Sequence, residues 1–306
     1  MGMTNPVIFF NRRYKSSEEV ELYSECVFFH GESVDERGDA VNTENKNISQ
    51  RILVNYDFEN MQICLNGKVV DADNATNLIG PFLSEKKIVI EATTLGFAEM
   101  FFVIKALTEL KISEYIVLYV EPAEYNREKK GSDRFAISEI NSGYRSIPKS
   151  IIDLASDDVT AGVFFLGYEA QRLETALEEF QMLSNKDIKV AFGIPAFQPG
   201  WELNSIVPHL NVIENWEYSY CAANDPDLAY DVLETTRSSL GNNKKMFVAP
   251  IGTKPCGIAA AIFASLYPEQ VGLLYDHRTK KIKRSKGLNV WHRYSIKFIN
   301  FNSYIA

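Results

Sequence analysis

Short apolar segments alternate with longer helical patterns over most of the chain beyond residue 86, and this alternation predicts the fold. The apolar segments are rich in Val, Ile and Phe, which is typical of buried strands, and they lie at 87–92, 115–120, 162–166, 189–194, 246–249 and 271–275. Between two of them, Leu173, Leu177 and Phe180 recur at helical spacing. Strands that alternate with helices predict a Rossmann-like α/β domain over 86–306, with a mostly parallel sheet and helices on both faces.

Residues 1–85 have a different pattern. Apolar segments at 7–10, 26–29 and 52–54 are separated by charged and polar stretches, and residues 31–50 read as a long exposed loop. Asn66-Gly67 lies between two apolar segments, and this pair tolerates positive φ at both centres of a two-residue hairpin turn. We therefore expect residues 1–85 to form a mainly β N-terminal extension or subdomain.

The segment after the strand at 87–92 predicts a helix that is apolar on nearly every side. Its large apolar residues are Phe97, Met100, Phe101, Phe102, Val103, Ile104 and Leu107. Such a helix is buried in a core or in a subunit interface, and we expect a homodimer because one sheet face would not cover it. The polar residues 123–147, which include Arg127 and Arg134, are predicted to form a lid over the strand ends.

The strand at 246–249 leads into the turn Gly252-Thr253-Lys254-Pro255 and then into an alanine-rich helix. Proline suits the first helical position, so Lys254 is expected to cap this helix. The first N–H groups of a helix and its dipole attract anions, and Gly257 would allow a ligand to approach closely. The turn is thus predicted to bind a phosphate, although a strand-turn-helix junction without a ligand has the same pattern. Neither a Walker loop nor a G-x-G-x-x-G motif is found in the sequence.

Ligands of open α/β sheets bind beyond the carboxyl ends of the strands. The polar and glycine residues expected there are Thr93, Thr94, Gly96, Tyr168, Glu169, Arg172, Gly252, Thr253, Lys254, Gly257 and Asp276. Some have simpler interpretations: Thr93 and Thr94 as helix caps, and Glu169 with Arg172 as an exposed i,i+3 ion pair. Asp276 beside His277 could be an acid–base pair, but neighbours on a strand face opposite ways. We identify no catalytic residue.

The charge, apolar runs and cysteines of the chain limit which nucleic acids, membranes or metals it could bind. A formal net charge of −8 over 306 residues argues against a protein that coats nucleic acid or membrane surfaces. The basic run at 278–286 is a candidate for local nucleic-acid contact, or else a solvated hairpin tip. No apolar run is long enough to span a membrane, and no secretory signal is evident. The 4 cysteines are scattered, so we expect no metal, no other cofactor, and a reducing cytoplasm.

At Gly252-Thr253-Lys254-Pro255 and the small-residue helix after it, the chain resembles the CRISPR-associated Rossmann-fold (CARF) sensor domains. The resemblance covers residues 86–277 and includes a Thr93-Thr94 loop after an early strand. It implies that the two loops bind cyclic oligoadenylate at the two-fold axis of a homodimer. The chain departs from the family at Ile251, where a second glycine is common, which makes it a remote relative.

The leading hypothesis is a cytoplasmic sensor or regulator that binds a nucleotide or another phosphorylated ligand at the strand ends. It would act through a homodimer or an operon-encoded partner, in phage defence or regulation. Two alternatives stay open. One is a phosphodiesterase or nuclease acting on a nucleotide signal or on nucleic acid, and the other is a non-catalytic structural subunit of a larger complex.

Overall fold

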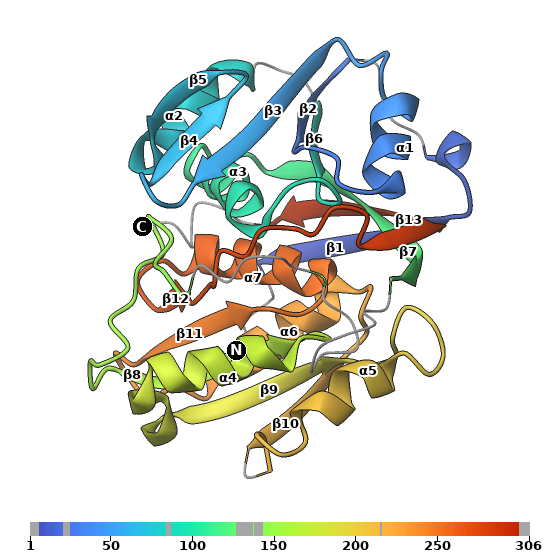
Figure 1. Ribbon diagram of the computed structural model, residues 1–306. Helices are drawn as coiled ribbons and strands as arrows, with labels where there is room; N and C mark the ends of the chain where they lie inside the picture. The colour runs from blue at the N-terminus through green and yellow to red at the C-terminus, as the bar shows by residue number, and fades with distance from the viewer. Residues whose placement is uncertain are drawn as a thin grey trace. The chain divides into compact units, whose positions relative to one another are not determined.

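The chain forms two compact units, described here from a computed structural model (Figure 1). The structure describes residues 6–20, 25–83, 87–126, 137, 143–214 and 216–299. Unit 1 comprises Met1–Glu124 and Ser285–Ala306, and unit 2 comprises Tyr125–Arg284. The chain thus leaves unit 1 once and returns to it once, with unit 2 inserted between. The boundary expected at residue 85 falls inside unit 1.

Unit 1 is built on a mixed sheet with strand order β1-β13-β7-β6-β2-β3-β4-β5. The strands are β1 (Val7–Tyr14), β2 (Cys26–His30), β3 (Gln50–Asp57), β4 (Gln62–Leu65), β5 (Lys68–Asp71), β6 (Lys87–Glu91), β7 (Glu114–Tyr125) and β13 (Ser285–Phe298). The pairs β7–β6, β6–β2 and β2–β3 are parallel, whereas β1–β13, β3–β4 and β4–β5 are antiparallel. The α/β class is confirmed, but the mostly parallel sheet does not extend to this unit.

Three helices belong to unit 1 among the described residues: α1 (Glu36–Glu44), α2 (Ala75–Ile79) and α3 (Phe97–Glu109). The predicted hairpin is confirmed as β4–β5, with φ of 48° at Asn66 and 85° at Gly67. The exposed loop predicted over 31–50 is wrong, because α1 lies there and begins at the capping side chain of Asp35. Its sequence lacks an apolar stripe, since Val41 is its one large aliphatic residue.

Unit 2 is built on an all-parallel sheet with strand order β10-β9-β8-β11-β12. Its strands are β8 (Val159–Leu166), β9 (Asp187–Gly193), β10 (Glu217–Cys221), β11 (Lys245–Pro250) and β12 (Val271–Leu273). Its helices are α4 (Ala170–Glu179), α5 (Glu202–Ile206), α6 (Pro226–Ser238) and α7 (Lys254–Leu266). The predicted parallel sheet is therefore present in unit 2.

The order of these strands creates a switch point. The chain moves outward from β8 through β9 to β10, then returns across the sheet to β11 on the other side of β8. Because parallel crossovers are right-handed, α6 and α7 lie on the opposite face from α4. Crevices between strands whose connections diverge in this way are the usual ligand sites of open α/β sheets. In unit 2 that position is between the carboxyl ends of β8 and β11.

The core of unit 2 packs tightly around these two strands. Phe164 and Phe247 meet edge to face at 5.5 Å, and Leu173 of α4 packs in the same cluster. Gly162 pairs with Phe247 across the strands, and a Cβ atom on Gly162 would lie only 2.0 Å from the Phe247 ring. Helix α7 is buried along nearly its whole length, which explains its alanine-rich sequence. The carboxyl ends of β8 and β11 therefore extend from a tightly packed core.

Candidate functional site

Two glycines bring the carboxyl ends of β8 and β11 into close contact. A Cβ atom on Gly167 would lie 2.9 Å from the carbonyl oxygen of Ile251, and one on Gly252 would lie 3.0 Å from the carbonyl oxygen of Phe165. Contacts of that length between a Cβ atom and backbone oxygen are too short to be tolerated without a shift. The turn predicted to bind phosphate is therefore pressed against the end of β8, at the switch point of the sheet.

The helix after this turn begins one residue earlier than expected. Thr253, not Lys254, is the N-cap of α7, with φ −73° and ψ 158°. The Gly257 N–H donates to the Thr253 carbonyl at 3.1 Å, so this N–H is engaged within the helix and does not face a ligand. Lys254 opens the first turn and is half-buried. The N–H groups before Gly257 and the lysine side chain carry the positive character of this helix start.

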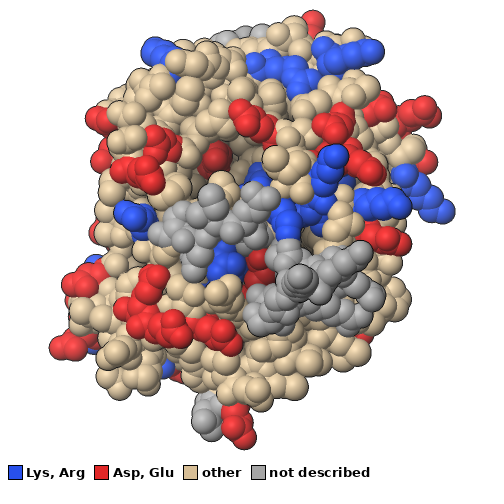
Figure 2. Space-filling model, viewed as in Figure 1, with Lys and Arg blue, Asp and Glu red and all other residues tan. Residues whose placement is uncertain are grey.

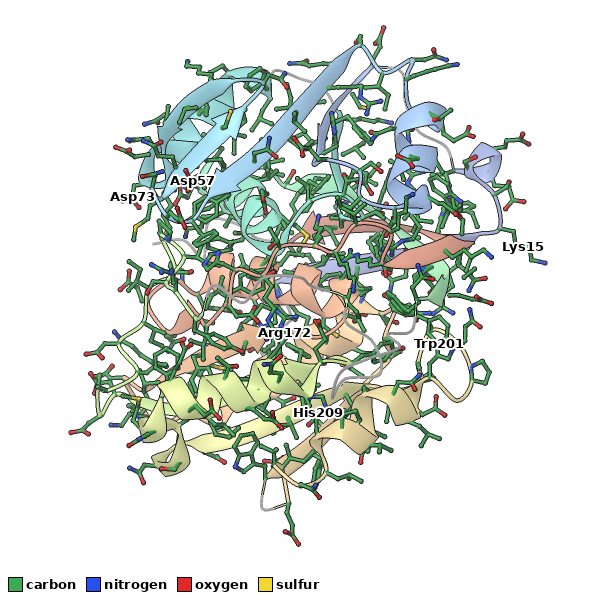
Figure 3. The ribbon with its side chains drawn as sticks, viewed as in Figure 1. Lys15, Asp57, Asp73, Arg172, Trp201 and His209 are labelled. Atoms are coloured by element: carbon green, nitrogen blue, oxygen red, sulfur yellow. The ribbon has the colours of Figure 1, made fainter. Side chains whose placement is uncertain are left out.

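A buried ion pair between Arg172 and Asp276 contacts the start of the Gly252–Pro255 turn. The guanidinium of Arg172, a residue of α4 that Figure 3 labels, donates to both carboxylate oxygens of Asp276, at 2.7 and 2.5 Å, and to the Ile251 carbonyl at 3.0 Å. The two side chains are 12% and 1% exposed. Arg172 is thus the link between the segment after β12 and the residue that precedes Gly252, which makes it a positioning residue for the turn.

The two charges shift each other's pKa in the expected directions. Burial alone would lower the pKa of Arg172, but the Asp276 carboxylate outweighs it and the pKa is raised. Burial alone would raise the pKa of Asp276, but Arg172 and then Arg278 outweigh it and the pKa is lowered. Asp276 therefore stays ionised near neutral pH. It faces two arginines, which does not suit it to exchange protons with His277.

Glu169 is buried, whereas its spacing from Arg172 suggested an exposed i,i+3 ion pair. Its carboxylate lies 3.8 Å from Arg278 and accepts a hydrogen bond from the Ile137 N–H at 3.0 Å. Arg278 also lies 3.1 Å from Asp276, and its side chain is only 8% exposed. The predicted basic run at 278–286 consequently begins inside the unit, whereas Lys283 and Lys286 are exposed.

Three aromatic rings gather beside these strand ends. Tyr168, which follows Gly167, lies 5.5 Å from the ring of Tyr125 and 6.5 Å from that of Trp201, and the latter two are 5.6 Å apart. All three are half-buried, and burial raises the pKa of Tyr168. The sequence pointed to Tyr168 alone. Trp201 and Tyr125 lie far from it in the chain, and only the fold brings the three together.

The other predicted site residues lie in unit 1, at the carboxyl end of β6. The Glu91 carboxylate accepts hydrogen bonds from the N–H groups of Thr93 and Thr94, both at 2.8 Å, and from the Thr94 hydroxyl. The Thr94 oxygen accepts from the Gly31 N–H at 2.9 Å, and the Thr93 oxygen accepts from the Val120 N–H at 3.0 Å. Both threonines are buried and bind the strand ends of unit 1 together.

Gly96 completes this group as the N-cap of α3. A Cβ atom there would lie 2.1 Å from a carboxylate oxygen of Glu99, so the acidic side chain is folded over the helix start. A carboxylate in that position satisfies the dipole of the helix itself. The structure thus places Thr93, Thr94 and Gly96 in one unit and Tyr168, Glu169, Arg172, Gly252, Thr253, Lys254, Gly257 and Asp276 in the other.

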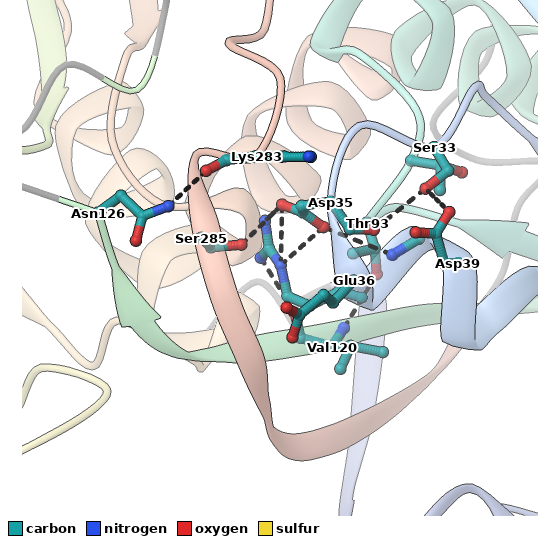
Figure 4. A network of polar contacts seen from close by, with 12 residues as sticks. Ser33, Asp35, Glu36, Asp39, Thr93, Val120, Asn126, Lys283 and Ser285 are labelled. Carbon is teal, nitrogen blue, oxygen red and sulfur yellow. Dashed lines mark hydrogen bonds and ion pairs between the residues drawn. The ribbon is translucent and has the colours of Figure 1, made fainter.

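A polar network that the sequence did not indicate anchors α1 in unit 1 (Figure 4). Arg37 pairs with Asp35 at 2.5 Å and donates to the Val120 carbonyl at 3.2 Å. Asp35 also accepts from the Ser285 hydroxyl at 2.7 Å. The network joins α1 to β7 and to the first residue of β13. The charges of Asp35 and Arg37 face each other and other protein groups, which indicates a structural role.

Within the described residues, no cluster of three or more His, Cys, Asp or Glu has the arrangement of a metal site. No helix in the same part of the chain is long and apolar enough to cross a membrane. Figure 2 shows both acidic and basic side chains among the coloured residues of the face in view. The lid predicted over 123–147 falls largely outside the described residues.

Comparisons of the chain with protein-family models, with curated proteins and with solved structures give no match.

Proposed function

We propose that unit 2 binds a nucleotide or another phosphorylated ligand at the carboxyl ends of β8 and β11 and that the protein is a sensor or regulator. One observation carries the proposal: the turn that the sequence marks as a phosphate site lies at the switch point of an all-parallel sheet. The phosphate would face Lys254 and the first turn of α7.

The aromatic cluster of Tyr125, Tyr168 and Trp201 supports a nucleotide over a simple phosphate. Aromatic side chains bind bases by stacking, and such stacking is tolerant of base identity. Tyr168 directly follows Gly167, the residue pressed against Ile251. A base beside Tyr168 and a phosphate at Lys254 would therefore occupy the two strand ends together.

The charges around the turn favour binding over catalysis. Asp276 is fixed between Arg172 and Arg278, and its lowered pKa keeps it ionised at neutral pH. Arg172 is committed to Asp276 and to the Ile251 carbonyl. Groups that hold each other in this way position a ligand-binding turn but are poor proton donors or acceptors.

The ligand class follows from the resemblance to the CARF domains, which suggests a cyclic oligoadenylate and a homodimer or an operon-encoded partner. The experiment is calorimetric titration of the whole protein with ATP, AMP, linear oligoadenylate and cyclic oligoadenylate. We expect at least one to bind, and we expect Lys254→Ala to weaken binding about ten- to hundredfold, the effect of losing a charge-assisted contact of about 1.5–3 kcal/mol.

Lys244→Ala is the matched control. Lys244 directly precedes β11, at the end opposite the turn, and pairs with exposed Asp158 at 3.9 Å. The control should bind like the parent protein. Equal affinity in Lys254→Ala, or no binding of any nucleotide, would contradict the proposal. Chromatography of each nucleotide after incubation separates binding from hydrolysis, because a phosphodiesterase would leave a ring-opened or shortened product.

A further inference from the structure

Two cysteines from distant parts of the chain face each other beside the turn. Cys221, the last residue of β10, and Cys256, in the first turn of α7, have their sulfur atoms 3.9 Å apart. Each is 2% exposed. Unoxidised thiols that approach this closely need only a local adjustment to reach the bonding distance of about 2.05 Å. The sequence did not indicate the pair, because 35 positions separate the two residues.

The two thiols are not equivalent. Hydrogen bonds from Cys221 and Thr253 lower the pKa of Cys256 against the opposing effect of burial. The hydrogen bond to Cys256, together with burial, raises the pKa of Cys221. A cysteine at a helix N-terminus reacts readily because the thiolate is favoured there. A protonated cysteine beside it can then attack the oxidised sulfur and close a disulfide. Cys256 therefore suits the attacking role and Cys221 the resolving role.

We propose that Cys221 and Cys256 form a reversible disulfide on exposure to hydrogen peroxide. The Cys256 thiolate attacks one peroxide oxygen, the O–O bond breaks, and the leaving oxygen takes a proton, which yields a sulfenic acid and water. The Cys221 sulfur then attacks the Cys256 sulfur, the S–O bond breaks, and hydroxide leaves with the Cys221 proton as a second water. Two thiols are oxidised by two electrons in total, and the peroxide is reduced to two waters.

The consequence for the turn rests on the proposed function. The Thr253 hydroxyl lies 2.8 Å from the Ala223 carbonyl oxygen and 3.2 Å from the Cys256 sulfur, so it joins the segment that follows Cys221 to the start of α7. Drawing the first turn of α7 toward β10 displaces Thr253 and, with it, Lys254. Oxidation is therefore expected to weaken nucleotide binding, and reduction is expected to restore it.

Burial sets which oxidants can act. Hydrogen peroxide is close to water in size and reaches the pair through local opening of the turn, whereas glutathione disulfide is too large for thiols that are 2% exposed. Burial also protects the finished bond from bulky reductants. We expect hydrogen peroxide to form the bond and glutathione disulfide to leave both cysteines unmodified.

The experiment treats the whole protein with one equivalent of hydrogen peroxide, traps thiols with N-ethylmaleimide under denaturing conditions, and maps peptides by mass spectrometry. Two of the 4 thiols should be lost, and a peptide pair linked through Cys221 and Cys256 should be found. Dithiothreitol should restore both thiols. Cys221→Ser should accumulate a sulfenic acid at Cys256, trapped by dimedone. Cys64→Ser, which replaces a half-buried cysteine on β4, should behave like the parent protein.

Retention of all four thiols, or a link that involves Cys26 or Cys64, would overturn the disulfide. A normal disulfide with unchanged nucleotide affinity would overturn only its effect on the turn. If the reduced protein binds no nucleotide, the proposed function fails while the disulfide is still decided by the peptide map. The two proposals are thus tested separately.

Discussion

At the scale of single residues, the charge pair of Arg172 and Asp276 determines how the candidate site is held. The sequence identified both residues as strand-end candidates because each follows a predicted strand. It could not show that they bind each other, since they are 104 positions apart and the spacing rules for helices apply only to near neighbours. The partner of a buried charge is a property of the fold.

Arg172→Met tests the energetic role of this pair. The substitution leaves the Asp276 carboxylate buried with less compensation, and breaking a buried pair in this way costs roughly 3–5 kcal/mol. Urea unfolding should show that loss. Glu217→Gln is the control, because Glu217 pairs with Lys189 at 2.9 Å but is 60% exposed, and such a pair contributes at most about 1 kcal/mol. Similar losses in the two variants would contradict the assignment.

Asp276 also predicts a pH dependence of stability. Its pKa in the folded protein is below the ordinary value of 3.8, so its contribution is complete above that value and is lost as pH falls through the folded pKa. The unfolded chain takes up the proton first, which favours unfolding in acid. Asp276→Asn should be less stable than the parent protein at pH 7, and the difference should shrink below about pH 4. A constant difference from pH 7 to pH 3 would exclude this linkage.

At the scale of elements, the turn between β11 and α7 was the most predictable part of the site. Proline near a helix start and glycine before it are local signals, and they placed the turn correctly to within one residue of the N-cap. Helix α1 was missed because its residues carry little apolar pattern. The close contact between Gly167 and Ile251 depends on strands that are neighbours in the sheet, so no local pattern indicates it.

Gly252→Ala tests whether the close approach of the β8 and β11 ends is required. The added Cβ atom would meet the Phe165 and Leu166 carbonyl oxygens at 3.0 and 3.1 Å, which forces the two strand ends apart. Overpacking of this kind costs about 1–3 kcal/mol and should also weaken nucleotide binding. In Gly241→Ala the new atom meets only the Lys244 side chain, at 3.6 Å, so little change is expected. Thermal melting and calorimetry of the two variants compare the sites directly.

Helix α3 shows how an element can mislead about assembly. Its apolar residues suggested a homodimer, yet residues from Phe97 to Thr108, apart from Glu99, are buried within a single chain. Part of the covering comes from unit 1 itself, where the ring of Tyr56 of β3 packs against that of Phe102 with 4.9 Å between the ring centroids. The sequence underestimated the available cover because it treated residues 1–85 as a separate extension. The homodimer now rests on the family resemblance alone.

At the scale of the whole molecule, the division of the chain was the least predictable feature. The alternation of strands and helices is found on both sides of the boundary between the units, since β6 and most of β7 belong to one unit and β8 to the other. The sheet of unit 1 joins segments from opposite parts of the sequence, because Val7 of β1 pairs with Phe298 of β13. Pairings of such long sequence separation leave no periodic signal.

The insertion predicts how the chain can be cut. Unit 2 has its own sheet and core, so a fragment of residues 125–284 should fold and melt cooperatively. Residues 1–124 alone lack β13, the strand between β1 and β7, and should not fold.

Joining residues 1–124 to residues 285–306 should restore folding, and the joint can be short. The Asn126 N–H donates to the Arg284 carbonyl at 3.0 Å, so the chain enters and leaves unit 2 at adjacent points, and a few Gly and Ser residues suffice as a linker. Circular dichroism and thermal melting of the three fragments give the result. A folded 1–124 fragment, or a linked fragment that stays unfolded, would show that β13 does not complete the sheet of unit 1 as the strand order requires.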